Sequence, residues 1–76
     1  MKKNMILNVI AEALQINIKN LNEKSDYNNT VAWDSLAITN IIVALEEEFD
    51  IDIELDDAEN FISVKNILSI MENKYL

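Results

Sequence analysis

The 76-residue chain contains no cysteine, histidine, arginine, glycine or proline. Without cysteine, neither a disulfide nor a thiolate metal site can stabilise so small a domain. Without cysteine and histidine, no serine has the usual base of a hydrolytic nucleophile. The net charge of −8 and the absence of arginine argue against a DNA- or RNA-binding protein, which needs basic side chains to neutralise phosphates. The acidic surface instead favours basic partners.

No apolar run approaches the ~20 residues of a membrane span. The opening MKKNMILNVIAEAL has a faint likeness to a signal peptide, but Asn4, Asn8 and Glu12 interrupt it, so we expect a helix of the mature domain. No repeat, linker or low-complexity segment divides the chain, which predicts one domain over residues 1–76. We expect a monomer, and the lack of cysteine is consistent with a cytoplasmic protein.

Apolar spacing predicts a first helix over residues 4–15. With glycine absent, the abundant asparagine is the expected left-handed residue, so Asn17 or Asn20 should end this helix. A long connection over residues 16–33 follows. Its apolar residues are expected to anchor it to the core: Ile18, Leu21, Tyr27, Val31 and Trp33.

The second helix should begin near Ser35 and continue to about residue 49, with Asp34 as its N-cap. The following FDIDIELD alternates like a strand, but a lone strand has no partner and is not stable. We therefore expect an extended connection that buries Ile51, Ile53 and Leu55.

A short third helix should start after Asp56, capped with the help of Glu59 three residues on. The last helix should span residues 64–74. Its buried stripe should comprise Val64, Ile67, Leu68 and Met71. The predicted fold class is therefore all-α, with four helices, a long loop between the first two and a short third helix.

The second helix has two apolar faces on a wheel of ~100° per residue. The core face should comprise Ile38, Ile41, Ile42, Leu45 and Phe49. The opposite face, which we call the docking strip, comprises Leu36, Asn40, Val43 and Glu47. A surface helix has no packing reason to carry leucine and valine there, which favours a protein-binding surface. Single exposed apolar residues are also ordinary, so the helix alone leaves both interpretations open.

Ser35 stands at the start of this helix and has three possible roles. As a nucleophile it lacks a base, because Asp34 is a weak base better suited to capping. As a plain helix-terminal serine it needs no further explanation. As the acceptor of a phosphate-containing group it would hold an anion where free amides and the helix dipole favour one.

The stretch WDSLAITNIIVALEEEFDIDIELDDAENFISVKNILSIM resembles the second half of an acyl carrier protein. Such proteins carry Asp-Ser-Leu at the start of the second helix, then a variant of ALEEEF, an acidic D-I-x-I connection and a last helix after Ser/Thr-Val. Asp34-Ser35-Leu36 and the residues that follow fall in register without gaps. The first half matches more loosely, through its amphipathic helix and Tyr27 ahead of Val31. The resemblance implies a discrete (type II) carrier with an acyl-carrier-like four-helix bundle.

The resemblance also implies a chemistry. A phosphopantetheinyl transferase would join 4′-phosphopantetheine from coenzyme A to the hydroxyl of Ser35, with magnesium held at the transferase. The thiol of this arm would hold an acyl or aminoacyl group as a thioester, so the reactive sulfur is imported. On this basis the chain is not an enzyme.

Partner contacts follow from the same resemblance. Asp34 and Leu36 match positions that contact the transferase, and Val43 and Glu47 match positions read by partner enzymes. An acyl- or aminoacyl-loading ligase, a synthase or an acyltransferase with a basic surface is expected to dock here. The implied partner surface comprises Leu36, Asn40, Val43, Glu46 and Glu47.

Several residues depart from the family pattern. Ala32-Trp33 replace the usual Gly-x, Ala37 and Asn40 replace acidic residues of fatty acid carriers, and Glu54 replaces a frequent proline. These changes favour a pathway-dedicated carrier, for a specialised acyl, polyketide or aminoacyl system, over the housekeeping carrier of fatty acid synthesis. Trp33 is expected to be a packed anchor, with a place beside the arm as the alternative.

Residues 46–59 hold nine of the fourteen carboxylates. Asp50-x-Asp52-x-Glu54 opens like a calcium loop, but Leu55 and Phe61 occupy the positions that need glycine and glutamate, so no specific metal site is expected. From a different class of function, the alternative is an unmodified helical adaptor that binds a partner through Leu36 and Val43.

Overall fold

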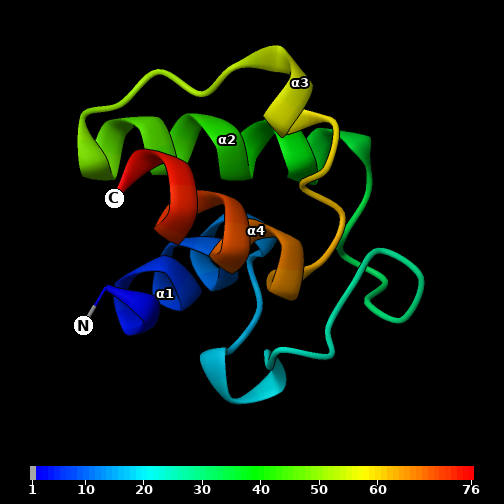
Figure 1. Cartoon of the computed structure of the whole chain (residues 1–76). Coiled ribbons are helices and arrows are strands. Elements are labelled where there is room, and N and C mark those ends of the chain that lie inside the picture. The colour runs from blue at the N-terminus through cyan, green and yellow to red at the C-terminus, as the bar shows by residue number, and fades with distance from the viewer. Residues whose placement is uncertain (1) are drawn as a thin grey trace.

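The computed structural model describes residues 2–76, and its helices run in the order α1 (Lys3–Leu14), η1 (Ile18–Asn20), α2 (Ser35–Phe49), α3 (Leu55–Ala58), α4 (Val64–Ile70) and η2 (Met71–Tyr75). Figure 1 shows α1, α2 and α4 packed together, α3 lying over α2, and η2 continuing α4 to the C-terminus. This is the all-α architecture with a long first connection and a short third helix that the sequence predicts.

The helix α1 ends earlier than expected, and asparagine does not end it. Gln15, with φ 58° and ψ 41°, is the left-handed residue, so the assignment to Asn17 or Asn20 was wrong. Within residues 2–76, only Gln15 and Asp50 have positive φ. The asparagines act through their side chains instead, since Asn17 Oδ1 accepts the amide of Lys19 at 2.9 Å. Such local side-chain bonds compete with a left-handed cap.

Only two of the five expected anchors hold the connection between α1 and α2. Leu21 and Trp33 are buried, whereas Ile18, Tyr27 and Val31 are exposed, and their assignment as anchors was wrong. Backbone hydrogen bonds hold the connection in place instead: Tyr27 N donates to Ile62 O, and Val64 N donates to Ser25 O, both at 3.0 Å. These bonds fix the connection against the α3–α4 segment and leave its side chains free to face water.

The helix α2 has the predicted bounds and core face. Ile41 and Leu45 are fully buried, with Ala37 beside them, and the other core-face residues pack against this core. Asp50, at φ 53°, ends the helix, and its N–H donates to the carbonyl of Glu46.

The segment between α2 and α3 is extended, as predicted, but buries less. Ile51 and Ile53 are half-buried against the core, whereas Leu55 is 76% exposed, so its predicted burial was wrong. The helix α3 begins at Leu55 rather than after Asp56, and Glu54, its N-cap, makes no side-chain cap bond. The carbonyl of Glu54 already accepts the amides of Asp57 and Ala58 at 3.0 Å, which starts the turn before the expected capping box.

The last helix also differs in detail. Val64, Ile67, Leu68 and Met71 form the predicted buried stripe. However, α4 proper ends at Ile70, and residues 71–75 continue as a π-helix. The wider π-helical turn places Lys74 and Tyr75 against Glu54 and Asp57, and we call these four residues the C-terminal latch.

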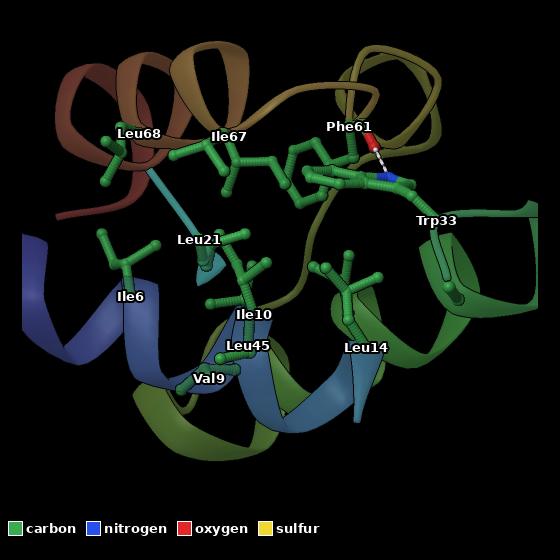
Figure 2. Close-up of a cluster of buried hydrophobic side chains, with 14 of the residues drawn as sticks. Ile6, Val9, Ile10, Leu14, Leu21, Trp33, Leu45, Phe61, Ile67 and Leu68 are labelled. Carbon is green, nitrogen blue, oxygen red and sulfur yellow. Dashed lines mark hydrogen bonds between the residues drawn. The ribbon is translucent and has the colours of Figure 1, made fainter. Parts of the chain in front are cut away.

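The core closes around Trp33 and Phe61. Figure 2 shows the indole beside the ring of Phe61, with Leu14 and Ile67 near them, and a hydrogen bond from Trp33 Nε1 to the Phe61 carbonyl at 3.3 Å. Trp33 is 3% exposed and Phe61 fully buried, so Trp33 is the packed anchor that we preferred. Among the helices described, none is long and apolar enough to cross a membrane.

Candidate functional site

Asp34 builds the N-terminus of α2. Its backbone is extended, and its Oδ1 accepts the amide of Ala37 at 2.8 Å, while its carbonyl accepts the amide of Ile38 at 3.0 Å. This is the predicted N-cap, which satisfies amides that a helix start otherwise leaves unpaired. Ala37, where fatty acid carriers have an acidic residue, is buried beneath this cap.

Ser35 follows directly and is exposed. Among the hydrogen bonds formed within residues 2–76, none involves its hydroxyl, whereas its carbonyl accepts the hydroxyl of Thr39 at 3.2 Å. Ser63 shows the contrast, because its Oγ caps α4 by accepting the amide of Asn66 at 3.0 Å. In α2 the capping bond is made by Asp34, so the hydroxyl of Ser35 is not needed as a cap.

A surface recess of about 260 Å³ lies between the end of α1 and the start of α2, and the two sequence neighbours of Ser35 help to line it. Its walls combine apolar and polar side chains, and it is open to solvent. It is lined by Ala13, Leu14, Gln15, Ala32, Asp34, Leu36, Ala37 and Asn40. Two residues of the predicted site, Asp34 and Leu36, therefore also shape this recess.

The docking strip lies on the exposed face of α2. Leu36 is 69% and Val43 47% exposed, and Asn40 and Glu47 are exposed between and beyond them. No core packing accounts for these apolar side chains, so the strip is an apolar surface with one carboxylate at its far end.

Glu46 differs from the rest of the implied partner surface. It is half-buried, and its Oε2 accepts the amide of Ile53 at 2.9 Å. Its carbonyl also accepts the amide of Ile51 at 3.2 Å. Glu46 thus fastens the segment between α2 and α3, and one of its two carboxylate oxygens is engaged there.

The acidic tract forms one specific set of contacts, the C-terminal latch. Lys74 Nζ lies 2.8 Å from Asp57 Oδ2 and also pairs with Glu54, and Tyr75 donates to Asp57 at 2.5 Å. The amide of Glu54 donates to the Tyr75 hydroxyl at 2.9 Å. Within residues 2–76, no group of three or more acidic side chains is arranged to hold a metal ion.

These contacts shift three titrations in the latch. The hydrogen bond from Lys74, and then that from Tyr75, holds the pKa of Asp57 below its ordinary 3.8. Hydrogen bonds to Asp57 and Glu54 raise the pKa of Lys74 above 10.5. Burial, and then the bond to Asp57, raises the pKa of Tyr75 above 10.0. Sequence reasoning missed this latch because its partners lie 17 to 21 positions apart, beyond any helical spacing.

An exposed serine with an unbonded hydroxyl at a capped helix start, next to an exposed apolar helix face, fits a carrier domain. The chain matches the protein family described as "Phosphopantetheine attachment site" over residues 4–70. It is 37% identical over 67 residues to an acyl carrier protein of Desulforapulum autotrophicum, covering 87% of each chain. It is 33% identical over 69 residues to an acyl carrier protein of Buchnera aphidicola, covering 91% of this chain and 87% of the relative. A third, from Nitratidesulfovibrio vulgaris, is 30% identical over 66 residues, with 87% of each chain covered.

The chain therefore belongs to the acyl carrier protein family. Members of this family are non-catalytic carriers, and their cofactor is phosphopantetheine. Membership also brings a phosphopantetheinyl transferase and acyl-handling enzymes as the general class of partners.

Proposed function

We propose that Ser35 is the residue that carries the phosphopantetheine arm, and that the protein presents acyl or aminoacyl thioesters to the enzymes of one dedicated pathway. The observation that carries this proposal is the exposed hydroxyl of Ser35, which the cap of Asp34 leaves without an intramolecular role. Ser63, the other helix-starting serine, already uses its hydroxyl as a cap.

In the loading step, the Ser35 oxygen forms a new bond to the phosphorus of coenzyme A that bears the pantetheine. The pyrophosphate P–O bond breaks, adenosine 3′,5′-bisphosphate leaves, and the hydroxyl proton passes to a base of the transferase. The product phosphodiester carries one negative charge next to the amides of Ser35 and Leu36. Neither of these amides has a hydrogen-bond partner within residues 2–76, and the positive end of the α2 dipole favours an anion there.

The docking strip supports the partner side of the proposal. Its apolar residues, Leu36 and Val43, supply area that loses water on docking, and Glu47 supplies a charge that a basic partner would read. The strip begins one residue after Ser35, so an enzyme seated on it has the arm within its reach.

A dedicated pathway is supported by the sites where the chain departs from fatty acid carriers. Ala37 is buried under the α2 cap, and Asn40 is exposed in the middle of the strip without a charge. The strip therefore carries its negative charge at one end only. Electrostatic discrimination between partner enzymes depends on the positions of the surface charges, so this pattern favours partners other than those of fatty acid synthesis.

The test is incubation of the purified protein with coenzyme A, magnesium and a broad-specificity phosphopantetheinyl transferase, followed by intact-mass measurement. We expect a gain of one phosphopantetheine for the wild type and for Ser69→Ala, a matched control at an exposed helical serine. Ser35→Ala should gain nothing. Folded wild-type protein that gains no mass would favour the unmodified adaptor, and a gain that persists in Ser35→Ala would place the arm elsewhere.

A further inference from the structure

Two buried aromatic side chains lie close to the start of α2, where Ser35 stands. Trp33 precedes Ser35 by two residues and turns inward, where it is 3% exposed, and Phe61, from the α3–α4 segment, is fully buried beside it (Figure 2). The hydrogen bond from Trp33 Nε1 to the Phe61 carbonyl joins the two across 28 residues of sequence. We call this pair the aromatic wall.

Behind the wall the core is filled. Ile41, Leu45 and Val64 are fully buried, and they belong to the same core cluster as Trp33 and Phe61. Protein interiors are packed as densely as organic crystals, so extra methylenes enter only if side chains move out. For an acyl chain that folds back on its arm and enters the core beside Ser35, the residues to be moved are Trp33 and Phe61, the aromatic side chains of the buried core, and Trp33 is tied by a hydrogen bond.

On the solvent side of Ser35, an attached group does not have to displace core side chains. The recess between α1 and α2 is open to water and mixes Leu36 and Ala13 with the polar ends of Gln15 and Asn40. A group lying there keeps polar atoms hydrated, whereas a long alkyl chain there stays mostly in water. The surroundings of Ser35 therefore suit small or polar groups better than long saturated ones.

We propose that the aromatic wall is a specificity determinant that keeps the cargo outside the core, so that this carrier takes short or polar acyl groups, such as aminoacyl or hydroxyacyl groups, rather than long saturated chains. This inference rests on the proposed attachment at Ser35 and narrows the cargo class of that site. Trp33 and Phe61 act here by occupying space, and neither is a catalytic residue.

The test is the reactivity of the thioester as a function of chain length. Apo protein is loaded with acetyl-, butyryl- and decanoyl-phosphopantetheine, each confirmed by intact mass, and the thioesters are then treated with hydroxylamine. A chain that entered the core would shield its thioester, since each buried methylene shifts the buried–exposed equilibrium by about fourfold. With the wall in place we expect rates within about twofold of one another.

Two variants assign the effect to the wall. Trp33→Ala and the milder Phe61→Leu open space behind Ser35 and should slow the decanoyl thioester by about tenfold or more, while the acetyl thioester keeps its rate. Trp33→Phe keeps a ring in place and is the matched control, with no slowing expected. Far-UV circular dichroism establishes which variants are folded, and Phe61→Leu decides the question if Trp33→Ala unfolds.

A second arm does not depend on the transferase. The chain has no cysteine, so Ser35→Cys creates a unique thiol to which ethyl or decyl groups can be joined through a disulfide. A decyl group that entered the core would raise the melting temperature relative to the ethyl adduct, because burial that occurs only in the folded state stabilises it. We expect equal melting temperatures, as for the same adducts of Ser69→Cys.

The outcomes separate the two proposals. Decanoyl protection of tenfold or more in the wild type, or a decyl-specific rise in the Ser35→Cys melting temperature, would overturn the aromatic wall. Folded wall variants that gain no protection would also overturn it. Failure of Ser35 to load counts against the proposed attachment site, and the disulfide adducts still decide whether the wall excludes a chain.

Discussion

The hydroxyl of Tyr75 lies 2.5 Å from Oδ2 of Asp57, so the last turn of the chain holds the one-turn helix α3 in place. The same hydroxyl accepts the amide of Glu54, at the N-cap of α3, at 2.9 Å. A helix of four residues cannot sustain itself, because its nucleation cost is repaid only by contacts made outside it. The C-terminal latch supplies such contacts.

Removing the Tyr75 hydroxyl should loosen α3 more than the rest of the molecule. In Tyr75→Phe we expect amide hydrogen exchange over residues 57–61 to become about fivefold faster or more, because both hydrogen bonds of the hydroxyl are lost. Exchange in α1 should change little. Tyr27→Phe, at an exposed tyrosine of the long connection, is the control and should leave α3 unaffected. Equal acceleration throughout the chain would contradict a local latch.

The latch should respond to pH through Asp57. Its pKa is lower in the folded protein than its ordinary 3.8, so the carboxylate stabilises the fold above that value. This contribution is lost as the pH falls below 3.8 and through the folded-state pKa. We therefore expect the stability difference between wild type and Asp57→Asn, from urea unfolding, to be constant between about pH 5 and 9 and to vanish in acid.

At alkaline pH the dependence is reversed, and the stabilisation by the latch is lost as the pH rises. Lys74 and Tyr75 have raised pKa values, so their contribution is complete below about pH 10 and is lost as the pH rises through those values. The wild type should lose its advantage over Asp57→Asn there too. A difference independent of pH from acid to alkali would show that Asp57 contributes nothing through its charge.

The cap of α2 can be separated from any role of its charge. Asp34→Ala should lower the stability by about 1 kcal/mol, or roughly 4–8 °C in melting temperature, because the Ala37 amide loses its partner. Asp34→Asn keeps an oxygen cap and should retain most of the stability. If Asp34 also contacts the transferase through its charge, Asp34→Asn will load more slowly while melting normally. Normal loading by Asp34→Asn would show that Asp34 acts only as a helix cap.

The long connection should depend on its buried residues and not on its apolar composition. Leu21→Ala should cost about 2–5 kcal/mol, since its side chain is buried in the core. Val31→Ala should change the stability by less than about 0.5 kcal/mol, because Val31 is fully exposed. Chemical denaturation of the two variants tests this. A large loss in Val31→Ala would mean that the connection packs differently in solution.

The docking strip predicts a difference between neighbouring glutamates. Glu47 lies on the strip, whereas Glu48 lines a hollow against α1 with Met5 and Asn8. Glu47→Lys should lower kcat/KM for a partner enzyme about fivefold at low salt, and the effect should shrink as salt is added. Glu48→Lys makes the same change of charge and should have a smaller effect. Equal losses would indicate net charge rather than a defined surface.

Local rules predicted much of this molecule. Asp34 as a cap, the core face of α2 and the stripe of α4 follow from residue type and helical spacing, which act over one or two turns. The candidate serine could be found in the same way, because its availability depends on the neighbouring cap. The exposure of Leu36 and Val43 also follows from the wheel, with no tertiary information.

Features set by distant partners could not be predicted. Ile18, Tyr27 and Val31 are apolar, yet the backbone bonds to residues 62 and 64 decide which way the connection faces. Leu55 is exposed because α3 starts where the carbonyl of Glu54 accepts the amides of Asp57 and Ala58, and the latch then fixes that position. Without glycine, the left-handed ends fall on Gln15 and Asp50, and although aspartate tolerates this conformation, no propensity singles out Gln15.

The aromatic wall also gives the protein an internal optical reporter. Trp33 is the only tryptophan of the chain, and it lies two positions from Ser35 with its indole N–H on a carbonyl of the α3–α4 segment. Its fluorescence, excited selectively over that of the two tyrosines, therefore reports on one known environment. Loading, partner docking and loosening of α3 can be followed at that single ring, in unlabelled protein and in real time.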